Sequence, residues 1–107
     1  MTGKQIDKAL GAAATLMEHL TSWEWNDPRN AFDVLEYVGA TKIYIEAFIA
    51  CFDDAKESKR VLKALRDDFN RLEENATRRD FGEVATDTAL IGYHLFNAIK
   101  YSTKLWA

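Results

Sequence analysis

The stretch that decides the fold is residues 28–52, PRNAFDVLEYVGATKIYIEAFIACF. At about 100° per residue, its large apolar side chains gather on one broad side of a helix, and its acids lie away from that side. Asp27 can cap such a helix, and Pro28 suits the first helical position, where a missing N–H costs nothing. The pattern therefore predicts a helix over residues 28–53 that most of the core contacts.

Three further segments carry apolar residues at helical spacing. They cover residues 4–23, 55–75 and 82–105, and only short turns separate them. Acidic capping patterns at Asp54 and Asp80 precede the last two segments. One proline and five glycines leave little material for long loops. We expect an all-α protein, a compact antiparallel four-helix bundle that forms a single domain over residues 1–107.

The composition restricts the class of protein. Apolar residues make up 48% and charged residues 29%, which is typical of a packed globule and not of a disordered chain. The only cysteine, Cys51, leaves no partner for an intramolecular disulfide. No apolar run approaches the roughly 18 residues of a membrane span, and the first residues lack the apolar segment of a secretory signal. We expect a cytoplasmic protein of bacterial or phage origin that does not bind membranes.

Recognisable motifs for catalysis or metal binding are missing from the sequence. His19 and His94 are the only histidines, and neither follows a glutamate by three residues, the spacing of di-iron bundles. There is no phosphate-binding glycine loop and no Gly-x-Ser-x-Gly motif. His94 could act as a general base only if it lined a cleft with Asp87 or Glu83. We expect a protein that is not an enzyme and that holds no cofactor and no metal.

Acidic and apolar residues mark candidate binding positions. Residues 18–54 hold eight acids against two basic residues, within a chain of net charge −3, and this half favours a partner with a basic surface. Apolar residues also lie outside the main faces of the second and fourth predicted helices, where they serve either lateral packing or another chain. The two tryptophans near residue 24 either close the end of the bundle or leave one indole exposed as an anchor. The candidate partner-binding residues are Trp23, Glu24, Trp25, Asp27, Phe32, Glu36, Gly39, Ile43, Glu46, Asp53, Leu90, His94 and Tyr101.

A basic stripe on the third predicted helix raises the question of nucleic acid. It consists of Lys56, Lys59, Arg60, Lys63 and Arg66, which lie opposite the apolar line of that helix. The acidic total, the intermixed acids and the lack of a helix-turn-helix pattern argue against nucleic-acid binding. A solvated surface is the simpler interpretation.

These observations favour a function based on binding. We expect a small acidic protein that binds and inhibits or neutralises a macromolecular partner, as immunity proteins, antitoxins and anti-defence inhibitors do. The alternative is a self-associating helical scaffold or accessory subunit, a homodimer that contacts nucleic acid through the basic stripe. The mass in dilute solution distinguishes a monomeric inhibitor from a tight symmetric dimer.

Overall fold

The computed structural model describes residues 3–25, 31–52 and 56–106 of the chain. Four α-helices and one short 3-10 helix follow one another along these residues. They are α1 (Gly3–Thr21), η1 (Ser22–Trp25), α2 (Ala31–Ile49), α3 (Lys56–Thr77) and α4 (Phe81–Trp106). The predicted all-α bundle is confirmed.

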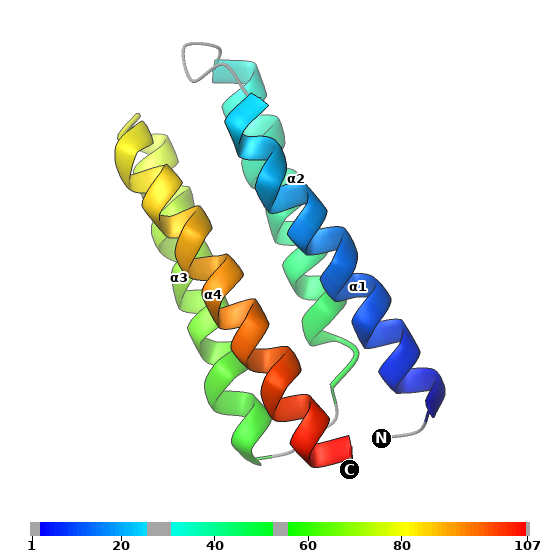
Figure 1. Ribbon diagram of the computed structural model, residues 1–107. Helices are drawn as coiled ribbons and strands as arrows, with labels where there is room; N and C mark the ends of the chain where they lie inside the picture. The colour runs from blue at the N-terminus through cyan, green and yellow to red at the C-terminus, as the bar shows by residue number, and fades with distance from the viewer. Residues whose placement is uncertain (1–2, 26–30, 53–55, 107) are drawn as a thin grey trace.

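Successive helices run in opposite directions, and both termini lie at one end of the bundle (Figure 1). Helix α1 contacts α2 and α4, and α3 contacts the same two helices. Helices α2 and α4 therefore occupy diagonal positions, and their outward sides point in opposite directions. The molecule is elongated, with principal extents of 45 × 21 × 17 Å.

The core is one cluster to which all four α-helices contribute. Its largest fully buried side chains include Leu16 of α1, Phe48 of α2, Leu65 of α3 and Leu95 of α4. Burying each of these side chains stabilises the fold by roughly 1.5–3 kcal/mol before conformational entropy is counted. Because each helix supplies one such stripe, the four stripes meet along the bundle axis.

Two predicted helix ends are wrong by a few residues. Helix α1 ends at Thr21 and not at residue 23, because the hydroxyls of Thr21 and Ser22 donate to the carbonyls of Glu18 and His19 at 2.7 and 2.6 Å. Such local hydrogen bonds compete with continuation of the helix. Helix α2 ends at Ile49 and not at residue 53, because its last turn tightens to i to i+3 hydrogen bonds.

The turn between α3 and α4 is a Schellman motif. The amide of Asp80 donates to the carbonyl of Asn75 at 2.9 Å, and the amide of Arg79 donates to that of Ala76 at 3.1 Å. Arg79 has a φ of 60°, the left-handed conformation that glycine usually supplies at this position. Asp80 Oδ1 then accepts the amide of Glu83 at 3.3 Å, so the predicted cap of the last helix is present.

No helix among the described residues is long and apolar enough to cross a lipid bilayer.

Candidate interaction surfaces

The outward side of α2 is apolar although it faces solvent. Leu35 is 71% exposed and Ile43 is 67% exposed. Gly39 lies between them with open space where a Cβ would stand, and Ala47 continues the same exposed side. Residues spaced by four on a helix share one side, so these side chains form a continuous strip, here called the α2 face. Exposed Glu36 and Glu46 flank this strip.

The composition of α2 makes this exposure unusual. It is the most apolar of the four α-helices, and its apolar residues extend around most of its circumference. A helix of this kind is normally covered on all sides. In the bundle, α1 and α3 cover two sides of α2. Ile43 is 67% exposed, so it does not pack between α2 and either of these helices. The α2 face is therefore available to another molecule.

Two of the candidate partner-binding residues on α4, Leu90 and His94, lie in different surroundings. His94 is half-buried, and its Nδ1 donates to Oδ2 of Asp68 on α3. Leu90 is 37% exposed beside it. His94 therefore packs laterally between α3 and α4, whereas Leu90 is exposed, and a partner-binding role for either residue stays a prediction.

Asp68 is the most deeply buried acid among the described residues, with 0% exposure. Its other oxygen, Oδ1, accepts a hydrogen bond from Nη2 of Arg71, one helical turn further along α3. The carboxylate therefore holds a guanidinium from its own helix and an imidazole from α4. Sequence reasoning missed Asp68, although it lies three residues after Leu65 and four before Leu72, on the side that both leucines bury.

A second buried polar network joins α1, α2 and α4. The hydroxyl of Thr41 donates to the carbonyl of Tyr37 at 2.7 Å, so His19 Nε2 must donate to Thr41 Oγ1, 2.6 Å away. The hydroxyl of Tyr37 is 3.0 Å from that of Thr88 on α4, and its ring stacks on His19 with centroids 4.6 Å apart. Burial lowers the pKa of His19, and a backbone hydrogen bond to Tyr37 opposes this effect. His19 is accordingly neutral near pH 7 and serves as a donor within the core.

The two polar networks use both histidines for packing between helices. His94 is paired with Asp68, whereas Asp87 accepts a hydrogen bond from the side-chain amide of Asn75 at 2.7 Å. The cleft of His94 with Asp87 or Glu83 that base catalysis would need is therefore not the arrangement found. Among the described residues, no three His, Cys, Asp or Glu side chains converge on a point where a metal ion could bind.

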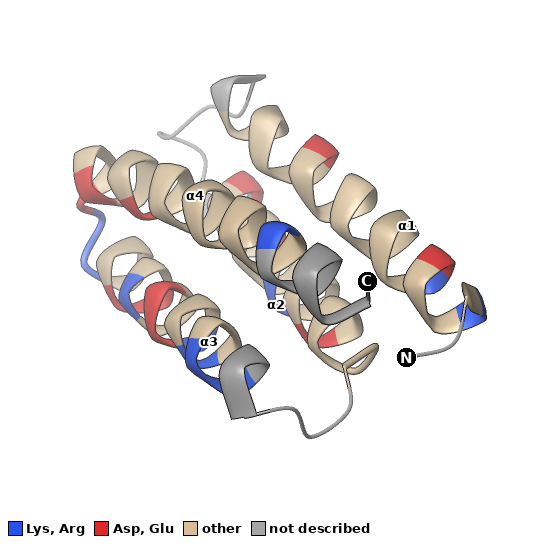
Figure 2. Cartoon of the chain, turned by 60° about the horizontal axis from the view of Figure 1, so that its bottom comes forward, with Lys and Arg blue, Asp and Glu red and all other residues tan. Residues whose placement is uncertain are grey.

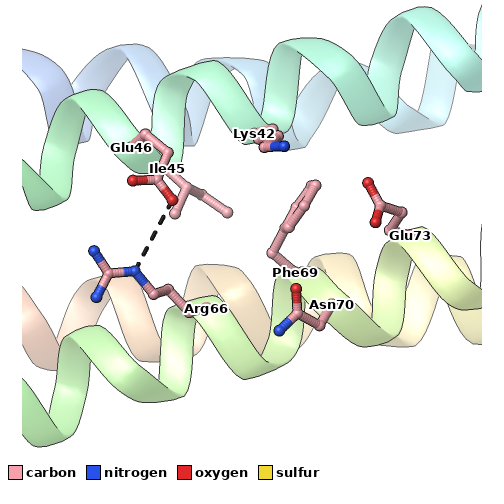
Figure 3. A pocket seen from close by; sticks show the side chains of 7 residues that line it. All are labelled: Lys42, Ile45, Glu46, Arg66, Phe69, Asn70 and Glu73. Atoms are coloured by element: carbon pink, nitrogen blue, oxygen red, sulfur yellow. Dashed lines mark ion pairs between the residues drawn. The ribbon is translucent and has the colours of Figure 1, made fainter.

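A shallow groove of about 150 Å³ lies between α2 and α3 (Figure 3). Ile45 and Phe69 point into the space between the two helices, and Lys42, Glu46, Arg66, Asn70 and Glu73 surround it. Nε of Arg66 lies 3.9 Å from Oε1 of Glu46 across the groove. Pockets that enclose small ligands measure about 300–1,000 Å³, so this groove is a notch in the packing of two helices.

The basic stripe is exposed where the structure describes it. Lys59, Arg60, Lys63 and Arg66 all face solvent on α3. From Lys59 to Arg66 the charged residues of α3 are all basic, and acids follow from Asp67 onward, as the blue and red bands show (Figure 2). Arg66 approaches a carboxylate of α2, which reduces the positive charge available to phosphates. A solvated surface stays the simpler interpretation of this stripe, and nucleic-acid binding stays the alternative.

Trp23 packs inward at the end of the bundle. It is half-buried, and its ring centroid lies 4.8 Å from that of Tyr37. Trp23 therefore closes the end of the bundle, one of the two roles expected for the tryptophans. Part of its side chain is still exposed to solvent.

Several candidate residues lie outside the part of the chain that the structure describes. For Asp27 and Asp53, and for Pro28 and Asp54 of the predicted caps, the structure describes neither backbone nor side chain. For five further residues the structure describes the backbone but not the side chain: Glu24, Trp25, Phe32, Lys56 and Tyr101.

Comparison of the chain with protein-family models, with characterised proteins and with solved structures gives no match.

Proposed function

We propose that this chain is a non-enzymatic binding protein that inhibits or neutralises a macromolecular partner through the α2 face. The observation that carries the proposal is the exposure of Leu35 and Ile43, at 71% and 67%, on the most apolar helix of the bundle. Large apolar side chains at the centre of a patch supply most of the free energy of association when a partner covers them.

The charges beside the α2 face indicate the chemistry of the partner. Glu36 and Glu46 are exposed along its edges and outnumber Lys42, the exposed base beside them, and Glu46 also lies 3.9 Å from Arg66. Carboxylates around an apolar centre favour a partner with basic residues around an apolar depression, and they increase its rate of association. Toxins and nucleases whose active surfaces are basic have this character. A cytoplasmic inhibitor of the immunity-protein or antitoxin type fits these requirements.

A binding titration with the natural partner tests the proposal. The partner is purified with the tagged protein from the cells that make it, and its activity is assayed with and without the chain. Ile43→Asp should weaken binding by about 30-fold, because a central apolar contact contributes at least about 2 kcal/mol. The circular dichroism spectrum should stay unchanged, because the side chain of Ile43 is 67% exposed and does not belong to the core.

Lys63→Asp is the matched control, since it introduces the same side chain at an exposed site on α3. It should leave the affinity unchanged or raise it for a basic partner. Loss of binding in Lys63→Asp with normal binding in Ile43→Asp would instead assign the interaction to the basic stripe and to an acidic partner such as nucleic acid.

A further inference from the structure

A second apolar surface lies on the opposite side of the molecule, along α1 and α4. Tyr93 and Phe96 of α4 are each 62% exposed, and Leu10 and Met17 of α1 are 44% and 38% exposed. Ala89, also exposed, lies on the same side of α4. These residues are here called the α1–α4 face.

The packing of α1 on α4 brings these residues to one side. A Cβ on Gly92 would lie 4.0 Å from Cδ1 of Leu20, so these two residues are level with each other. Because the helices are antiparallel, one turn from Leu20 toward the start of α1 and one turn from Gly92 toward the end of α4 lead in the same direction (Figure 1). Met17 and Phe96 are thus level as well, on the outward flank of the contact between α1 and α4.

The outward side of α4 is free of charge over most of its length. Between Glu83 and Lys100 the sequence contains two other residues that can carry a charge near neutral pH, Asp87 and His94. Asp87 is 3% exposed and bonded to Asn75, and His94 is turned toward Asp68. The middle of the α4 ribbon is accordingly tan, the colour of residues other than Lys, Arg, Asp and Glu (Figure 2).

From this pattern we infer that the α1–α4 face binds a second copy of the chain, with two α4 helices packed antiparallel about a two-fold axis near Tyr93. An uncharged face can meet itself without bringing like charges together, as an isologous interface requires. The α2 face would place Glu36 and Glu46 near their own copies, so it suits a basic partner and not self-association.

The ends of α4 add charge complementarity to this arrangement. Glu83 and Lys100 are exposed near opposite ends of the helix. An antiparallel pairing centred near Tyr93 brings Glu83 of each copy toward Lys100 of the other, whereas a parallel pairing would place like charges together. Area is sufficient too, since a long side of 45 by 21 Å can supply the roughly 800 Å² per partner that a stable interface buries.

The dimer has a consequence for the proposed function. Because α2 and α4 are diagonal in the bundle, pairing through α4 leaves both α2 faces exposed at the two far sides of the assembly. The dimer can then hold two partner molecules, and its avidity for a multimeric partner exceeds that of a single face. This inference is independent of the identity of the partner. A dimer that pairs through α4 and leaves the α2 face exposed is compatible with inhibition, so the mass in solution alone does not separate an inhibitor from a scaffold.

Sedimentation equilibrium at about 1–100 µM tests the inference. Wild type should show twice the chain mass of 12.2 kDa. Phe96→Glu should convert it to a monomer with unchanged circular dichroism, and Tyr93→Lys should do the same if the first variant disturbs folding. Ile43→Glu, on the α2 face, is the matched control and should remain a dimer.

The charges test the antiparallel geometry. Lys100→Glu should weaken the dimer several-fold, and the double change Glu83→Lys with Lys100→Glu should restore it. A monomeric wild type at about 100 µM overturns the inference, as does a dimer that Ile43→Glu dissociates and Phe96→Glu does not. Binding of the basic partner through Ile43 is measured separately, so failure of the dimer leaves the proposed function standing.

Discussion

Replacement of Asp68 by alanine gives the sharpest test of the polar network between α3 and α4. The carboxylate is fully buried, and it accepts hydrogen bonds from Arg71 of its own helix and from His94 of α4. Asp68→Ala removes both hydrogen bonds at once and leaves a small void beside Leu65 and Leu72.

The expected loss of stability follows from these two contacts. A hydrogen bond to a charged group contributes about 1.5–3 kcal/mol, so two of them set an upper limit of about 6 kcal/mol. The side chains of Arg71 and His94 are 52% and 27% exposed, so both can recover hydrogen bonds with water. We therefore expect the free energy of unfolding to fall by about 2–3 kcal/mol, which lowers Tm by roughly 8–15 °C in a chain of this size.

Urea denaturation at pH 7 followed by circular dichroism measures this difference. Asp67→Ala is the matched control, because Asp67 is the exposed neighbour of Asp68 on the same helix. It should change the free energy of unfolding by less than about 0.5 kcal/mol. Equal effects of the two substitutions would show that the buried carboxylate contributes nothing beyond its helix propensity, and the reasoning would fail.

Two further predictions concern a turn and a histidine. Arg79→Gly should raise the free energy of unfolding by about 0.5–1 kcal/mol in thermal denaturation, because glycine adopts the observed φ of 60° without the steric penalty of a side chain. Arg78→Gly, at a position without a positive φ, should lower stability, and a gain there would contradict this explanation. Burial lowers the pKa of His19 in the folded protein, so the unfolded chain binds a proton there first as the pH falls. The contribution of His19 to stability is therefore complete above the pKa of the unfolded chain and is lost as the pH falls below it. Urea denaturation at falling pH should show a smaller decrease in His19→Gln, and an identical decrease would refute the assignment.

The sequence by itself determined the helices and which of their sides are apolar. The spacing of Leu65 and Leu72 in α3, and of Ile91 and Leu95 in α4, specifies buried stripes because a helix turns by a fixed angle per residue. The cap at Asp80 could also be predicted from the sequence, because it depends only on residues close in the chain. Helix ends were less certain, because hydroxyl groups such as those of Thr21 and Ser22 compete locally with the helix.

Only the tertiary structure decided how each helix is rotated against its neighbours. That rotation buries Asp68 and exposes Asp67, although the two residues are chemically identical and adjacent in the chain. It also turns His94 toward α3 and leaves Ile43 and Phe96 outward, so it separates apolar residues that pack within the chain from those free to contact another molecule. Periodicity fixes the angle between two side chains on one helix, whereas burial depends on which other helix lies opposite each of them.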